Sequence, residues 1–132
     1  MLALSADQLA FVTERHLATL TTLRADGSPH VVPVAFTWDA ETGRARVTTR
    51  GTSVKARNVE RADGSGHPVR AALCQFEGLR WLTLEGQITL CRHPAEVAEA
   101  VEAYALRYRQ LKFQVERVVL HMAVDRVMGT VR

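Results

Sequence analysis

The chain has 132 residues, 47% of them hydrophobic, a length and composition that suit one domain (1–132) with its own core. Its 17 basic and 14 acidic residues give a net charge of +3, but the two signs are interleaved and aromatic residues make up only 6%. A nucleic-acid-binding face is therefore not expected. A local site for an anionic group explains the basic excess better.

The sequence also predicts where the protein works. No apolar run approaches the ~20 residues of a membrane span, and the N-terminus lacks the basic start and cleavage site of a signal peptide. We therefore expect a cytoplasmic protein without membrane contact. A domain of this size buries only about two-thirds of its unfolded surface, so a large cofactor would need walls from a second subunit. This favours an oligomer.

The first part of the sequence predicts a helix followed by strands. Ser5–Glu14 opens with a capping residue and spaces its apolar residues as a helix does. Leu17–Leu23 alternates like a strand, and Asp26-Gly27 indicates a hairpin turn into a second strand, His30–Trp38. Ala45–Thr49 predicts the next strand, so we expect these three strands to form a meander.

The remaining elements follow in the same manner. Ser53–Arg61 predicts a short helix, and Val69–Gln75 and Arg80–Leu90 predict two strands. Pro94–Gln110 predicts the one long helix, with proline in its first turn and an apolar stripe along one side. Val115–Val127 alternates strongly enough to predict a closing strand.

This order of elements predicts the fold class. Six strands with two or three helices, and no repeated strand–helix–strand rhythm, indicate a mainly β antiparallel barrel with peripheral helices. Pro33 interrupts the second strand. Because proline cannot donate to a neighbouring strand, it favours an edge or a bulge, and less readily a contact with a ligand.

The segment from Thr48 to Asn58 has the composition of a phosphate site. A strand end delivers hydroxyls, Gly51 permits a tight turn, and the following helix presents free N–H groups at its positive end. Arg50 can add a planar fork of donors and Lys55 a point charge. The glycine spacing differs from that of a P-loop. The same residues are equally consistent with an ordinary capped helix that has a solvated basic face.

Other chemical motifs carry little signal. The histidines lack the spacing of a metal site, and we predict no metal. Cys74 and Cys91 are not in a CxxC arrangement, so we expect buried thiols. No GxSxG elbow indicates a nucleophile. Trp38 and Trp81 fit either the barrel core or a ring-binding cleft.

Five segments together resemble the split β-barrel flavin and deazaflavin oxidoreductases related to pyridoxamine 5′-phosphate oxidase. They are HLATLTTLRADGSPHVVPVAFTWD, RVTTRGTSVKARNV, RWLTLEGQITL, AYALRYR and RVVLHMAVDRVMG. Within this family the sequence looks most like the actinobacterial branch that uses coenzyme F420, and closest to its biliverdin-reducing members. RHLATLTTLRADGSPHVV and GLRWLTLEG carry that likeness.

The resemblance implies a six-stranded split β-barrel that binds F420, with FMN as the alternative cofactor. It implies a reductase that transfers a hydride to a conjugated small molecule, with biliverdin to bilirubin as the best match. It also implies a homodimer with two equivalent cofactor sites across the subunit interface. The cofactor-binding residues that it implies are Ser28, Pro29, His30, Val32, Thr48, Thr49, Arg50, Ser53, Lys55, Asn58, Gln75 and Trp81.

These residues would have three roles by the same resemblance. Arg50 and Lys55 would hold the phosphate with help from the neighbouring polar residues. The stretch from Ser28 to Val32 would border the ring system through its backbone. Gln75 and Trp81 would approach from the partner subunit. No catalytic acid or base is nominated.

Some alternatives stay open. The chain ends soon after its last strand, without the C-terminal segment with which pyridoxamine phosphate oxidases bind their substrate, so vitamin B6 oxidation is not expected. The propionates of a tetrapyrrole would meet Arg57, Arg61 or Arg80. The other candidates are an FMN-dependent oxidoreductase, a non-catalytic cofactor or tetrapyrrole-binding protein, and a basic barrel without a ligand.

Overall fold

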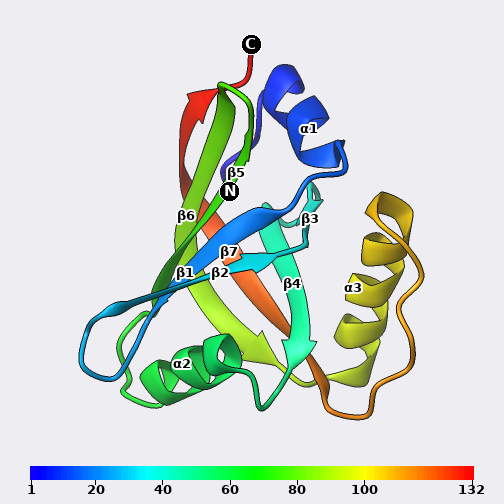
Figure 1. The fold of residues 1–132 in the computed structure, drawn as a ribbon. Helices are drawn as coiled ribbons and strands as arrows, with labels where there is room; N and C mark the ends of the chain where they lie inside the picture. Colours follow the sequence, from blue (N-terminus) through cyan, green and yellow to red (C-terminus); the bar gives the residue numbers. More distant parts are fainter.

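The structure is a computed structural model that describes residues 1–132. It has seven strands and three helices (Figure 1). In chain order they are α1 (Ala6–Thr13), β1 (Ala18–Leu23), β2 (Pro29–Val34), β3 (Phe36–Asp39), β4 (Arg44–Arg50), α2 (Val54–Asp63), β5 (Arg70–Glu77), β6 (Arg80–Cys91), α3 (Pro94–Arg107) and β7 (Arg117–Thr130). None of the three helices has the length and apolar character needed to cross a membrane.

All seven strands belong to one antiparallel sheet with the order β2-β1-β5-β6-β7-β4-β3. The two edge strands, β2 and β3, are joined by a single residue, Ala35. Because so short a link spans both edges, the sheet must curl until its edges approach each other. The result is the open barrel visible in Figure 1, with α2 and α3 outside it. The predicted split-barrel class is confirmed.

Two details of the sequence prediction are corrected. The expected strand His30–Trp38 divides at Ala35 into β2 and β3, which makes seven strands, not six. The expected meander is divided at the same residue: β1 pairs with β2 and β4 pairs with β3, but β2 and β3 lie at the two edges of the sheet. Pro33 lies on β2 opposite Thr19, and β2 pairs only with β1. The missing N–H of Pro33 therefore falls on an edge strand, as predicted.

The core fills the barrel from the inward positions of the strands. It comprises 17 buried residues, including Leu20, Phe36, Leu73 and Leu120. Helix α1 covers one end of the barrel and inserts Phe11 into this core. The helix starts there because Ser5 and Gln8 form a reciprocal capping box.

Helix α3 packs on the outside of β4 through charges. Glu96 lies 3.8 Å from Arg44, and Glu99 lies 3.4 Å from Arg46. The predicted apolar stripe of α3 therefore does not face the barrel core, and Ala100 is the only fully buried residue of the helix. The chain from 108 to 116, here called the α3–β7 segment, has no regular structure and leads back to β7.

Candidate functional site

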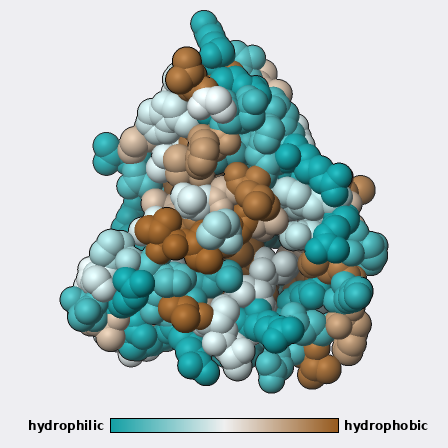
Figure 2. Space-filling model, viewed as in Figure 1, coloured by the Kyte–Doolittle hydropathy of each residue, from teal (hydrophilic) through white to brown (hydrophobic).

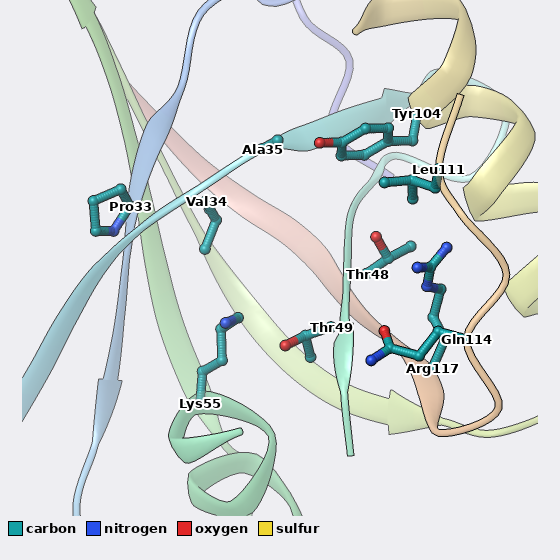
Figure 3. Close-up of a pocket in the computed structure, with 10 residues that line it drawn as sticks. All are labelled: Pro33, Val34, Ala35, Thr48, Thr49, Lys55, Tyr104, Leu111, Gln114 and Arg117. Atoms are coloured by element: carbon teal, nitrogen blue, oxygen red, sulfur yellow. The ribbon is translucent and has the colours of Figure 1, made fainter. Parts of the chain in front are cut away.

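A pocket of about 250 Å³ lies where four parts of the chain meet: the β2–β3 junction, the end of β4, the start of α2, and α3 with the α3–β7 segment. Its walls are Pro33, Val34, Ala35, Thr48, Thr49, Lys55, Tyr104, Leu111, Gln114 and Arg117. Figure 3 shows Lys55 and Arg117 reaching the pocket from opposite sides, with Thr49 between them. Two cations and two hydroxyls thus face one small space.

The start of α2 is organised by hydroxyl groups. Ser53 caps the helix, and its Oγ accepts a hydrogen bond from the Ala56 N–H at 3.3 Å. Thr49 Oγ1 donates to the same Ser53 Oγ at 3.0 Å, which ties the end of β4 to the helix start. The amides of Val54 and Lys55 precede the first intrahelical bonds, so they lie at the positive end of the helix dipole. This is the local geometry that favours an anion.

Lys55 is the charged group of this helix start. Its side chain is half-buried, and none of the ten salt bridges in the structure involves it. Burial lowers the pKa of its ammonium group, because removal from water penalises the charged form. A partly desolvated cation without a carboxylate partner is a ready site for a phosphate.

The predicted phosphate residues divide into two groups. Thr48, Thr49 and Lys55 line the pocket together. Arg50 is exposed and does not line it; its guanidinium lies 3.1 Å from the Gln114 side-chain amide when the amide oxygen faces it. The Ser53 hydroxyl oxygen accepts the hydrogen bonds of Thr49 and Ala56 and so serves the helix cap.

Asn58 has a structural role that differs from the prediction. It is only 4% exposed. Its Nδ2 donates to Thr22 Oγ1 at 3.1 Å, and its Oδ1 accepts from Arg61 at 3.0 Å. The amide nitrogen therefore joins α2 to β1, and the amide oxygen is used within α2.

Gln75 is also occupied within its own chain. It is 1% exposed, its Nε2 donates to Phe11 O at 2.8 Å, and its Oε1 accepts from Arg107 at 2.6 Å. Its approach to a cofactor in the partner subunit stays a prediction. Trp81, the other residue expected from the partner, is 37% exposed on β6 and stays a prediction.

The residues expected to border the ring lie near the pocket without lining it. Ser28 belongs to the β1–β2 turn, where its hydroxyl donates to Asp26 at 2.6 Å. Pro29, His30 and Val32 lie on β2, whose last residues reach the pocket. His30 has a buried Nδ1 without a hydrogen-bond partner. Their contact with a ring stays a prediction.

The three arginines expected to meet substrate carboxylates are in different environments. Arg80 is held at the far end of the barrel by two 2.9 Å hydrogen bonds to Glu14 and one of 2.7 Å to Glu77. These hydrogen bonds from Arg80, together with one from His16, lower the pKa of Glu14 to about 2. Arg61 donates to Asn58, whereas Arg57 is exposed and has no partner. Arg80 is thus not available to a substrate.

Ala35 and four residues from α3, the α3–β7 segment and β7 line the pocket but were not identified as site residues from the sequence. Tyr104 and Leu111 were noted only as members of the apolar stripe of the long helix. Gln114 and Arg117 lie in the α3–β7 segment and at the start of β7, and no local pattern marks them. They reach the site because β7 pairs with β4 in a register that sets Arg117 opposite Arg50.

Comparison with known proteins agrees with the resemblance predicted from the sequence. The model of the pyridoxamine 5′-phosphate oxidase family matches residues 4–130. An F420H2-dependent biliverdin reductase from Mycobacterium tuberculosis is 50% identical over 127 residues, which cover 96% of this chain and 88% of that protein.

Solved structures share the fold. A conserved hypothetical protein from Mycobacterium tuberculosis superposes with a TM-score of 0.79 at 20% identity, covering 98% of this chain and 86% of the other. An F420 reductase superposes with a TM-score of 0.71 at 20% identity, covering 90% and 94%. At such identities the likeness describes the fold alone.

Proposed function

Because the chain belongs to the pyridoxamine 5′-phosphate oxidase family, we propose that it is an F420-dependent reductase whose acceptor is biliverdin and whose product is bilirubin. The 50% identity to a reductase of that name supports the cofactor and the substrate. The observation on this chain that supports it most is Lys55, an unpaired and partly buried cation in the pocket at the start of α2.

The residues of the pocket fit the phosphate of the cofactor. Lys55 supplies the positive charge, Thr48 supplies a hydroxyl donor, and the helix start, which Thr49 ties to β4, supplies amides. Arg117, on the opposite wall, adds a second cation. We place the phosphate between these groups, where charge-assisted hydrogen bonds are stronger than neutral ones.

The same pocket is too small for a complete cofactor. Its volume of about 250 Å³ lies below the ~300–1,000 Å³ usual for sites that enclose a small molecule. We therefore propose that a second copy of the chain completes the site.

An uncharged face of the sheet is suited to that second copy. The strand pairing sets outward residues of β1, β2, β5 and β6 side by side. We call this surface the neutral face, and it comprises Thr19, Thr21, Val31, Pro33, Ala72, Cys74, Phe76, Trp81 and Thr83. Figure 2 shows apolar surface gathered in the middle of this view, over β1 and β2.

Exposure within the neutral face points to a protein partner. Val31 is 57% exposed, Phe76 60% and Trp81 37%. Interface cores lack charged residues and are enriched in aromatic ones, and patches of this kind on soluble proteins mark association sites. A homodimer formed here would bring Trp81 to the partner's site.

When bound, reduced F420 supplies a hydride, and a proton from the medium completes the two-electron reduction of the acceptor. The chain itself contributes binding and orientation. Lys55 and its hydroxyl neighbours fix the phosphate end, and the apolar walls Val34, Ala35 and Leu111 exclude water from the other side. Orientation of this kind accounts for much of the rate gain in a hydride transfer.

A titration tests the proposal. The purified protein is titrated with F420 and separately with FMN while fluorescence and melting temperature are followed. At a ligand concentration a hundredfold above Kd, binding stabilises the fold by about 2.7 kcal/mol, which raises the melting temperature by about 10 °C. We expect F420 alone to do so, and biliverdin absorbance to fall when biliverdin is added to the F420H2 complex.

The other outcomes are informative in different ways. Preference for FMN would move the protein to the flavin-dependent members of its fold. Binding of F420 without loss of biliverdin would keep the cofactor and remove the substrate. If neither F420 nor FMN binds, the proposal of a phosphate site at Lys55 is wrong.

A further inference from the structure

A larger hollow lies beside the cofactor pocket. It is a groove of about 720 Å³ between α3 and the α3–β7 segment, well within the range of sites that enclose a small molecule. We propose that this groove binds the acceptor of the hydride, an elongated conjugated molecule that carries carboxylates. The inference rests on the proposed function and assigns its substrate a place.

The walls of the groove are apolar. Val97 and Val101 form the side made by α3, and Phe113 and Val115 form the side made by the α3–β7 segment. Phe113 is 90% exposed and Val115 84% exposed. Apolar side chains left in water on both sides of one groove favour a flat apolar ligand that covers them.

The rim of the groove carries uncommitted positive charge. Lys112 and Arg117 line it and take part in no salt bridge. Arg92 also lines it but is held by Glu60 at 2.5 Å, and Glu102 is the only acidic side chain of the lining. Arg117 donates to the backbone carbonyl of Lys112 at 3.0 Å and also faces the cofactor pocket, which leaves Lys112 as the free cation of the rim. A free cation beside apolar walls matches a molecule with an apolar body and a carboxylate at its edge.

The groove and the cofactor pocket are contiguous. Leu111, Gln114 and Arg117 line both of them, and Figure 3 shows these three on the α3 side of the cofactor pocket. A molecule in the groove would therefore lie next to the bound cofactor. Hydride transfer requires this proximity, because the reacting atoms must approach to about 3–3.5 Å.

The arginines considered from the sequence are less suitable. Arg80 is committed to Glu14 and Glu77, and Arg61 to Asn58. Arg57 is exposed on α2 and lines none of the pockets described here. The carboxylates are therefore assigned to Lys112, because Arg117 serves the phosphate site.

Equilibrium binding tests the assignment without requiring turnover. The protein is saturated with oxidised F420, and biliverdin or its dimethyl ester is titrated while the bilin absorbance and induced circular dichroism are measured. We expect Lys112→Gln to raise the Kd of biliverdin about two- to fivefold, the range of an exposed ion pair. The Kd of the uncharged ester should not change. Phe113→Ala should weaken both ligands by a similar factor.

The matched control is Arg15→Gln, which removes an exposed cation that has no partner and lies in α1–β1, away from the groove. It should leave every Kd unchanged. Lys112 and Phe113 are exposed, so unfolding midpoints within error of wild type will show that the variants are folded.

Each outcome decides the question. An unchanged Kd for biliverdin in the double variant Lys112→Gln/Phe113→Ala overturns the inference, as does a wild-type protein that does not bind biliverdin. A raised Kd for F420 with unaltered biliverdin binding also overturns it and assigns the groove to the anionic tail of the cofactor. Biliverdin that binds with the predicted variant pattern but is not reduced supports the groove and contradicts the proposed function.

Discussion

Arg107 Nη1 donates a hydrogen bond to the carbonyl oxygen of Phe36 at 2.5 Å and thereby fixes the end of α3 to the first residue of β3. The same guanidinium donates to Glu14 O at 2.8 Å and to Gln75 Oε1 at 2.6 Å. It lies over the Phe36 ring, 4.7 Å from its centroid. One partly buried arginine thus holds the helix that carries Tyr104 against the β2–β3 junction, and both the helix and the junction border the cofactor pocket.

Replacement of Arg107 should therefore destabilise the fold. Arg107→Met keeps the length of the side chain but leaves the acceptors at Glu14 and Gln75 without this donor, and leaves Phe36 O with Tyr108 alone. An unsatisfied buried group costs about 1–3 kcal/mol, so we expect a total loss of about 3–5 kcal/mol in the free energy of unfolding. Urea denaturation measures it.

Arg109→Met is the control for this substitution. Arg109 lies two residues further along, is exposed and makes no side-chain hydrogen bond. The control should change the free energy of unfolding by less than about 0.5 kcal/mol. Equal losses in the two variants would mean that the contacts of Arg107 do not stabilise the fold.

Local patterns predicted most elements, and the errors arise at positions decided by long-range pairing. Alternation and capping gave the strands and helices within a few residues, because each pattern reflects one buried face. The division at Ala35 has no local signal, since apolar residues continue at period two from Val32 to Trp38. Only closure of the sheet separates β2 from β3.

The candidate site was predictable where its residues are close in sequence and not where long-range strand pairing brings them together. Thr48, Thr49 and Lys55 are close in sequence and were found together. Arg117 joins them through the pairing of β4 with β7, which no single-sequence pattern reveals. Asn58 was expected at the cofactor from the family resemblance, and the fold uses its amide to bond Thr22, so its contact with a cofactor stays a prediction.

Substitution of Asn58 separates these two roles. Asn58→Ala removes a buried amide and leaves Thr22 and Arg61 without its bonds, so we expect a loss of about 1–3 kcal/mol in the free energy of unfolding. The Kd of F420, measured by fluorescence well below the melting temperature, should change less than about twofold. A large rise in this Kd with unaltered stability would restore the residue to the cofactor site.

Lys55 should control cofactor affinity in a pH-dependent way. Lys55→Met should raise the Kd of F420 about 10- to 100-fold, because a charge-assisted bond contributes about 1.5–3 kcal/mol. Burial lowers the pKa of Lys55 in the free protein, so affinity should fall as pH rises through that lowered value. Lys55→Arg, which stays charged, should bind F420 without this alkaline loss.

The lowered pKa of Lys55 should also make the stability of the cofactor-free protein depend on pH. A lysine whose pKa is lower in the folded than in the unfolded state makes the fold relatively less stable while it is protonated. Its unfavourable contribution is present in full below the folded pKa and fades as pH rises from there toward 10.5. The free energy of unfolding of wild type minus that of Lys55→Met, measured by urea denaturation, should therefore increase as the pH is raised from 7 to 10.5. A flat difference would mean that Lys55 is as well solvated as in the unfolded chain.

The neutral face should determine the oligomeric state. Val31→Glu places a carboxylate on the edge strand β2, opposite Thr21 of the neutral face. A buried charge without a partner opposes association, so we expect sedimentation to detect a monomer where wild type is a dimer. Leu79→Glu is the matched control, because Leu79 is 94% exposed in the β5–β6 turn, outside the strand ladder.

Cofactor binding reports whether the partner completes the site. In the Val31→Glu monomer, Lys55, Thr49 and the start of α2 are unchanged, so the phosphate end of the pocket remains. We expect the Kd of F420 to rise at least tenfold all the same, because the remaining pocket of about 250 Å³ covers only part of the cofactor. A monomer that binds F420 as tightly as wild type would show that one chain forms the whole site, and Trp81 would then have no role in it.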